Sequence, residues 1–277
     1  MAAYRIAVVA PGAHIPPETA ERVLALAAHH YASDALQIHF HPQCFLSQGH
    51  FAGPDEARTA AFVEAANDPA FDAVWVGRGG YGACRMAPPA LARLSPAAAK
   101  KTYVGYSDGG ALLGGLYRAG IGRPVHAPIP GDIIRDDGDR AVLRTLRYLV
   151  DGDRSGLEAS DDAGAPRLAF NIAVLSSILG SELEPDFTDH VLMLEEVGEY
   201  TYRLDRYLFH ITAQANVQRC AGIRLGRVSQ TIANVPDFGV QEEHIIEMWC
   251  ARSGIPYLGR ADIGHDVDNK IVPFGQA

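Results

Sequence analysis

The chain has 277 residues, of which 48% are apolar and 21% are charged, a composition typical of a folded globular protein and not of a disordered one. The formal net charge of −9 argues against nucleic acid or a membrane surface as the main partner, because each would need a basic face. No apolar run approaches the length of about 20 residues that crosses a bilayer.

The four cysteines are widely spaced, without a C-x-x-C pair and without a histidine at the distance of a zinc finger. This spacing predicts reduced thiols in a cytoplasmic protein and neither a disulfide framework nor a zinc site. His39 and His41 have a spacing seen in some metal hydrolases, but no further acidic or histidine ligands follow at strand ends. We therefore expect no metal.

In the first half of the chain, single expected strands alternate with single expected helices. Strands are predicted at residues 4 to 9, 35 to 40, 72 to 76, 102 to 106 and 125 to 127, and helices at 17 to 30, 57 to 67, 86 to 94 and 109 to 118. Such alternation indicates parallel strands joined by right-handed crossovers, so residues 1 to 150 should form a doubly wound, Rossmann-like or flavodoxin-like sheet. Ligands then bind at the carboxyl ends of the strands.

A turn-rich segment at residues 151 to 169 divides the chain, and we interpret it as a linker. Beyond it, helices are predicted at 171 to 179, 203 to 215 and 242 to 252, and strands at 190 to 194, 222 to 228, 255 to 258 and 270 to 272. Residues 170 to 277 should form a smaller, mixed α/β domain. The predicted fold class is therefore α/β, with two domains.

Ser107 stands at a sharp turn between an expected strand and an expected helix. Gly105, Ser107 and Gly109 form G-x-S-x-G, the pattern of a nucleophile elbow, in which glycines let the backbone pass close to the serine. The following helix would aim free N–H groups, Asp108 among the first, at negative charge on a substrate carbonyl oxygen. A tight turn with a helix-capping Ser or Asp would give the same pattern, so partner residues must decide.

A glycine-rich loop follows the expected strand at 72 to 76 and contains G-x-G-x-x-G, which resembles a dinucleotide-binding fingerprint. It follows the third strand and not the first, so we favour a second half of an oxyanion hole, made by Gly79 and Gly80. Arg78 either binds a substrate carboxylate or forms an ion pair that stiffens the turn. Tyr106, next to the serine, is a second candidate for contacting the substrate.

The candidate partners of the serine lie in the second half of the chain. Glu195 ends an apolar strand, where a partly buried carboxylate needs a partner such as histidine; Glu196 and Glu199 are expected in the following loop. His265 lies in a turn-rich loop between two short strands, which suits an exposed imidazole that acts as a general base.

Four short segments of the chain are shared, in this order, with one known family. They are Arg78-Gly-Gly-Tyr-Gly82, Gly105-Tyr-Ser-Asp108, Leu194-Glu-Glu196 with Tyr202-Arg-Leu-Asp-Arg206, and Gly264-His265 with Pro273-Phe-Gly275. On these segments the chain resembles the LD-carboxypeptidase family of serine peptidases, which contains the muramoyltetrapeptide carboxypeptidases and the microcin C immunity peptidases. The resemblance implies a triad of Ser107, His265 and Glu195 divided between the domains, an oxyanion hole of backbone N–H groups, and no cofactor.

By the same resemblance, the substrate is a murein tetrapeptide that loses its terminal D-alanine during cytoplasmic cell-wall recycling, and the protein is a homodimer. The immunity branch cleaves amides between an acyl group and a nucleotide analogue, and tends to carry a longer, aromatic insert. Here 88 positions without tryptophan separate Ser107 from Glu195, which favours the murein branch. The residues are also compatible with an α/β-hydrolase esterase or with a binding module that has no turnover. Asp262 departs from the family pattern and is a candidate for altering the charge of the pocket.

Overall fold

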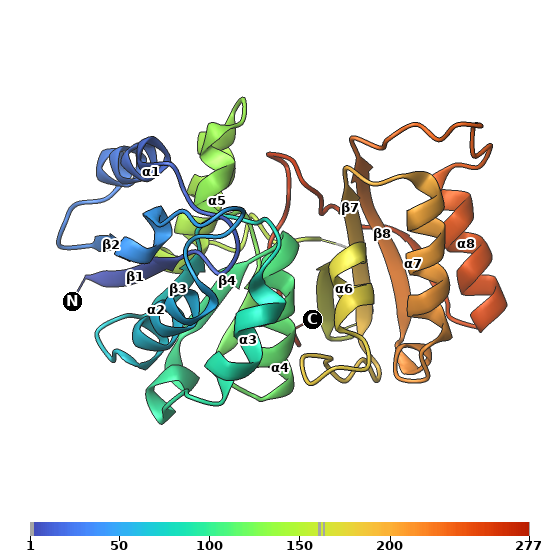
Figure 1. The fold of residues 1–277 in the computed structure, drawn as a ribbon, viewed down its shortest axis with the longest axis horizontal. Helices are drawn as coiled ribbons and strands as arrows, with labels where there is room; N and C mark the ends of the chain where they lie inside the picture. The colour runs from blue at the N-terminus through green and yellow to red at the C-terminus, as the bar shows by residue number, and fades with distance from the viewer. Residues whose placement is uncertain (1–2, 160–161, 163, 277) are drawn as a thin grey trace.

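The computed structural model describes residues 3–159, 162 and 164–276. Figure 1 shows two units side by side, each a sheet flanked by helices, with the first half of the chain in blue to green and the second in yellow to red. The predicted two-domain α/β class is confirmed. Among the described residues, no helix is long and apolar enough to span a membrane.

The first sheet has six strands in the order β10-β5-β4-β3-β1-β2. Its strands are β1 Tyr4–Val9, β2 Leu36–Phe40, β3 Ala73–Val76, β4 Thr102–Gly105, β5 Arg123–His126 and β10 Val272–Pro273. All pairings among β1 to β5 are parallel, and β10 alone runs antiparallel, against β5. The central strands are buried on both faces, as a parallel sheet between two helix layers requires.

Alternate residues of these strands face different helix layers. Ala7 and Val74 pack with helices α2, α3 and α4, whereas Ile6 and Trp75 pack with α1 and α5. The helices are α1 Pro17–His30, α2 Asp55–Asn67, α3 Ala83–Leu91, α4 Gly110–Arg118 and α5 Gly138–Val150. Sequence analysis had not assigned α5.

The second sheet has four parallel strands in the order β6-β7-β8-β9. They are β6 Arg167–Asn171, β7 Val191–Val197, β8 Gly222–Ser229 and β9 Tyr257–Arg260, and the helices are α6 Ile172–Ile178, α7 Thr201–Ala213 and α8 Glu242–Ser253. Strand β6 begins inside the segment predicted as a linker; its apolar run is only three residues long and follows a turn-rich stretch, so the sequence pattern did not reveal it.

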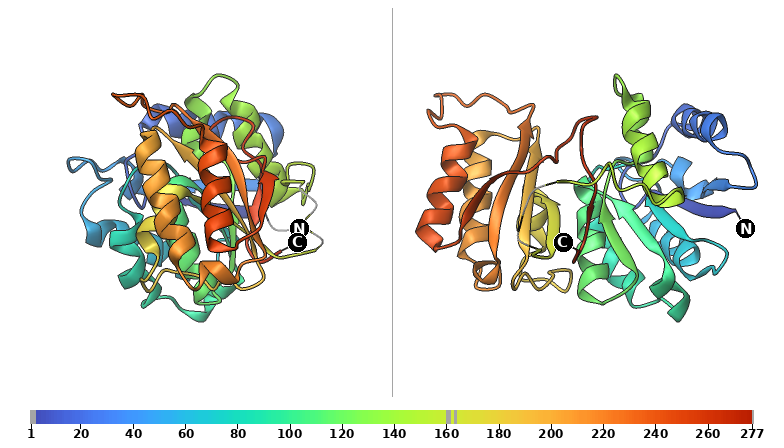
Figure 2. Two further views of the ribbon diagram at one scale, coloured as in Figure 1. Left: turned by 90° about the vertical axis from the view of Figure 1, so that its right-hand side faces the viewer. Right: turned by 180° about the vertical axis from the view of Figure 1, so that it is seen from behind.

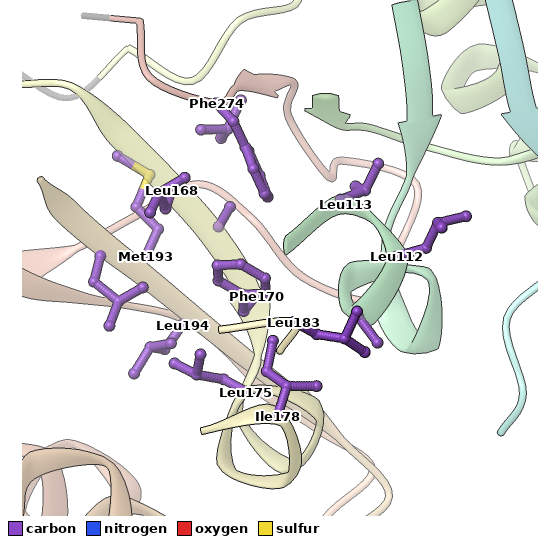
Figure 3. Close-up of a cluster of buried hydrophobic side chains, with 14 of the residues drawn as sticks. Leu112, Leu113, Leu168, Phe170, Leu175, Ile178, Leu183, Met193, Leu194 and Phe274 are labelled. Carbon is purple, nitrogen blue, oxygen red and sulfur yellow. The ribbon is translucent and has the colours of Figure 1, made fainter. Parts of the chain in front are cut away.

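The two units share one apolar core. Figure 3 shows Phe170 of β6, Leu183 and Phe274 from the end of the chain beside α4, which contributes Leu113 and, on the side away from Phe170, Leu112 to the same cluster. Strand β10 crosses back from the second unit and pairs with β5, as the view from behind in Figure 2 shows. The first sheet is therefore not built from residues 1 to 150 alone, and the units are fixed to each other by packing and by a strand.

Candidate active site

Ser107 stands where β4 ends and a 3₁₀ turn over Ser107–Gly109 leads into α4. Its φ is +58°, in the left-handed region that a non-glycine residue adopts only at a cost. A methyl group added at Gly105 would lie 3.0 Å from Val76 Cγ2, and one at Gly109 would lie 3.4 Å from Val76 Cγ1. Close packing of the turn on β3 thus favours glycine at position 105, whereas at position 109 the contact is an ordinary one; the strained serine between them has the geometry of a nucleophile elbow.

The glycine-rich loop lies directly against Ser107. A methyl group added at Gly79 would lie 3.0 Å from Ser107 Oγ, and Gly80 has a φ of +90°. The backbone carbonyl of Gly80 passes so close to Gly12 that a Cβ there would be 1.9 Å from the oxygen. Because the loop carries no side chain on this side, its backbone can face a group bound at Ser107.

A buried arginine that sequence analysis missed holds this loop. Arg58 on α2 is 1% exposed, and its Nη1 donates hydrogen bonds to Gly82 O at 2.8 Å and to Pro11 O. Its Nη2 also pairs with Asp55. The only sequence signal was an arginine in an alanine-rich helix, which predicts a surface position. Arg58 can be buried because its guanidinium binds carbonyl groups of two loops that are far apart in the sequence.

Asp108 connects the serine turn to the next helix. Its Oδ2 accepts a hydrogen bond from Ala83 N at 2.7 Å, at the first residue of α3. Burial raises the pKa of the Asp108 carboxyl to about 6, although this hydrogen bond opposes the rise. The side chain therefore fixes the turn, and the backbone N–H of Asp108 remains the part of the residue that an oxyanion hole would use.

His265 and Glu195 form a buried pair. Nδ1 of His265, on the loop between β9 and β10, bonds to Oε2 of Glu195 on β7. Sequence analysis expected an exposed imidazole, but His265 is only 8% exposed. Burial by itself lowers the pKa of His265, but the carboxylate of Glu195 outweighs it and the pKa is raised. Among the described residues, Nε2 of His265 is buried without a hydrogen-bond partner.

Tyr106 packs between the serine and this histidine. The ring centroids of Tyr106 and His265 are 4.9 Å apart, and the Tyr106 hydroxyl donates to Asp132 Oδ1 at 2.7 Å. Burial raises the pKa of Tyr106 well above its usual value, so the hydroxyl keeps its proton. Tyr106 thus presents its ring to the cavity while its polar end is satisfied. Arg78 is exposed on the same cavity and donates to His14 O at 3.1 Å.

Two hollows meet at Ser107. The first, of about 400 Å³, contains Ser107 and His265 together with two guanidinium groups, those of Arg78 and Arg135. We call it the basic lobe, although Arg135 donates to Asp132 Oδ1 at 3.0 Å. The second, of about 370 Å³, has an apolar wall and no basic side chain; its acidic residues are Asp108, Glu196 and Glu199. We call it the acidic lobe.

Sequence analysis had expected Glu196 in a loop, but its side chain lines the acidic lobe. It belongs to β7, is 2% exposed, and accepts hydrogen bonds from Asn171 Nδ2 at 2.7 Å, Ala173 N at 2.9 Å and Val197 N at 2.8 Å. Burial raises the pKa of Glu196 to about 7. The strand continues two residues past Glu195 because these donors satisfy the carboxylate.

Asp262 does not line either lobe. Its carboxylate pairs with Arg227, whose Nη2 also donates to Asp266 Oδ1 at 2.9 Å. Asp262 therefore holds the loop that carries His265. His39 and His41 do not point to a common site. The ring of His39 packs on Phe71, with centroids 5.5 Å apart, whereas His41 Nδ1 accepts a hydrogen bond from Gln43 N at 3.1 Å. Over the part of the chain that the structure describes, no three His, Cys, Asp or Glu side chains could jointly hold a metal ion.

Two family models match the two halves of the chain. Residues 6–127 match the family model described as the LD-carboxypeptidase N-terminal domain, and residues 167–277 match the LD-carboxypeptidase C-terminal domain. The murein tetrapeptide carboxypeptidase of Pseudomonas aeruginosa is 26% identical over 289 residues, which cover 98% of this chain and 91% of that protein.

Two solved structures share the fold. The muramoyltetrapeptide carboxypeptidase from Oxalobacter formigenes has a TM-score of 0.82 at 22% identity and covers 98% of this chain and 92% of its own. The microcin C7 self immunity protein MccF, in complex with aspartyl sulfamoyl adenosine, has a TM-score of 0.78 at 15% identity, over 100% of this chain and 97% of its own. Both comparisons span the two sheets, so the arrangement of the halves is shared as well.

Proposed function

This chain belongs to the LD-carboxypeptidase family, and from that premise we propose that it is a cytoplasmic serine peptidase that removes the terminal D-alanine of murein tetrapeptides in cell-wall recycling. One observation carries the proposal. Ser107, in a strained turn, shares a cavity with an imidazole whose Nδ1 is bonded to a buried carboxylate and whose Nε2 has no partner among the described residues. A nucleophile, a general base and its orienting acid need that arrangement.

The proposed reaction proceeds through an acyl-enzyme. His265 Nε2 takes the proton of Ser107 Oγ as that oxygen attacks the scissile carbonyl carbon, and Glu195 stabilises the imidazolium. Backbone N–H groups of Gly79, Gly80 and Asp108 are the proposed donors to the oxyanion. His265 then gives its proton to the leaving amine, which departs as D-alanine. Water, deprotonated by His265, hydrolyses the ester and restores Ser107.

The charges of the two lobes suggest how the substrate lies. A carboxypeptidase must accept a free carboxylate one residue beyond the scissile bond, and Arg78 in the basic lobe offers a guanidinium for it. The acidic lobe is then left for the acyl side of the substrate, where its apolar wall and carboxyl groups suit the side chain of a diamino acid better than an acidic one.

The charge of the acidic lobe also bears on the second candidate function, cleavage of acyl-nucleotide amides. MccF has been solved with aspartyl sulfamoyl adenosine, whose acyl group is an acidic amino acid. An aspartyl group placed in this lobe would meet the like charges of Asp108 and Glu199, which costs binding free energy. Glu196 adds less repulsion, because its pKa of about 7 leaves it partly protonated at neutral pH. We therefore favour the murein peptide over an acyl-nucleotide amide.

Release of D-alanine from purified murein tetrapeptide tests the proposal. We expect release by the wild type and by Ser33→Ala, an exposed serine on the loop after α1, and loss of about a million-fold in kcat for Ser107→Ala. A tetrapeptide that ends in L-alanine should stay uncut. Equal rates for wild type and Ser107→Ala would refute Ser107 as the nucleophile; cleavage of aspartyl sulfamoyl adenosine alone would favour the immunity branch.

The proposal includes a homodimer. Each chain has a mass of 29.8 kDa, so light scattering should give roughly twice that value in solution. A mass near that of one chain at micromolar concentration would contradict the dimer and would leave the assignment of the active site untouched.

A further inference from the structure

Two buried residues outside the triad connect His265 to the sheet that carries Ser107. We propose that Asn269 and His126 form a clasp that positions His265 relative to Ser107, and that this positioning is needed for turnover. The clasp concerns how the proposed active site is held together, and its kinetic test therefore rests on the proposed function. Neither residue lines the lobes at Ser107, so both are positioning residues and not catalytic ones.

The side chain of Asn269 joins the two ends of the clasp. Its Oδ1 accepts a hydrogen bond from Gly264 N at 3.1 Å, the residue before His265, and bonds to His126 Nε2 at 3.0 Å. Asn269 and His126 are 0% and 1% exposed. Because no water competes for these bonds, breaking one leaves a buried polar group without a partner.

His126 is well placed to transmit the position of the serine. It is the last residue of β5, and it lies opposite Gly105, the last residue of β4, in the parallel pairing of these strands. Ser107 follows Gly105 by two residues. The rings of His126 and His265 also both contact Tyr106, with centroids 5.6 Å and 4.9 Å from its ring. The clasp therefore spans a short path from the serine turn to the histidine loop.

The first unit holds the loop at a second point. Arg144 on α5 donates through Nη1 to Asn269 O at 2.8 Å and to Val267 O at 2.9 Å. In contrast, the ring of His265 is oriented by Glu195, which belongs to the second sheet. The second sheet thus orients the ring of His265 and holds one side of its loop through Arg227 of β8. The first unit, which carries Ser107, holds the other side of the loop through His126 and Arg144.

The hydrogen bonds also determine the tautomer of His126. The Gly264 N–H group can only donate, so the Asn269 atom that faces it is Oδ1, which can only accept. Nε2 of His126 must therefore carry a proton. Burial lowers the pKa of His126, which keeps the ring neutral. A neutral His126 places no second positive charge beside His265 when that residue becomes imidazolium.

A matched pair of amide substitutions separates the hydrogen bond from other effects. The amide nitrogen of glutamine can reach the position of His126 Nε2, whereas that of asparagine reaches only the position of Nδ1. We expect His126→Asn to lower kcat for D-alanine release about 30-fold with KM within about two-fold, because the substrate site is intact and the base is misplaced. His126→Gln should restore most of the lost kcat.

Equal kcat values for the two variants, or a loss confined to KM, would overturn the proposal. A purely structural role would lower the melting temperature of His126→Asn while leaving its kcat, measured well below that temperature, unchanged. If both variants fail to fold, 15N NMR of the histidine-labelled wild type tests whether His126 Nε2 donates to Asn269 Oδ1. Its His126 ring must be protonated at Nε2 and unprotonated at Nδ1 at pH 8, where histidine is ordinarily neutral; the opposite tautomer refutes the clasp without reference to activity.

Discussion

The two halves of the proposed active site are held in place by different means. The serine half is fixed by the backbone: a φ of +58° at Ser107, and glycines packed against Val76 and against Ser107 itself. The histidine half is fixed by side chains that come from distant segments, since Glu195 and His265 are 70 positions apart. The first half depends on the absence of side chains and the second on their presence, so different substitutions should damage each.

Apart from the loss of Ser107 itself, the largest effect is expected in the histidine half. Glu195→Gln keeps the shape of the side chain but removes the charge that stabilises the imidazolium, and it allows the wrong tautomer of His265. We expect kcat to fall about 10⁴-fold with little change in melting temperature. Glu21→Gln, an exposed residue of α1, makes the same change in net charge and should match the wild type. A loss under ten-fold for Glu195→Gln would mean that the carboxylate does not serve His265.

A smaller effect is expected when a methyl group is added to the serine half. Gly79→Ala places it 3.0 Å from Ser107 Oγ, at a residue whose φ lies outside the left-handed region. The backbone can therefore accept alanine, and the loss should come from crowding of the nucleophile. We expect kcat/KM to fall about 100-fold while the unfolding midpoint in urea stays within error. Unchanged kinetics would show that the loop does not approach the reacting atoms in solution.

Substitution of Arg78 should separate an effect on substrate binding from an effect on the chemical step. If Arg78 holds the terminal carboxylate, Arg78→Met should raise KM about ten-fold and leave kcat within about three-fold, since the triad is untouched. Arg22→Met, on the exposed face of α1, is the matched control. A ten-fold loss in kcat at constant KM would instead place Arg78 among the residues that organise the loop.

The smallest effect is a displacement of the pH profile. Protonated His265 cannot accept the proton of Ser107, so kcat/KM must fall as pH drops through the pKa of His265. Glu195 raises that pKa, so the acidic limb should have its midpoint above 6.5, the ordinary value for histidine. In Glu195→Gln the residual activity should have its midpoint at lower pH. A wild-type midpoint below 6.5 would mean that burial outweighs the carboxylate.

The contrast between the halves also explains which parts of the fold and of the candidate site could be predicted from the sequence. The doubly wound sheet, the serine turn and the glycine loop follow from local patterns, namely alternation of elements and closely spaced glycines. Arg58 and Asn269 could not be found, because each is buried by backbone groups from segments far apart in the chain. Strand β10 is two residues long, too short for any periodic pattern to assign it to the first sheet.

The return of β10 to the first sheet sets an order of assembly during synthesis. The turn with Ser107 leaves the ribosome long before the loop with His265, and the residues that tie this loop to β5, Asn269 and β10, come later still. Under the proposed function, a chain that stops before this loop has the serine without its base and should release no D-alanine. Strand β10 is the last of the described strands along the chain and completes the first sheet, so activity should appear only after Val272 and Pro273 have been made.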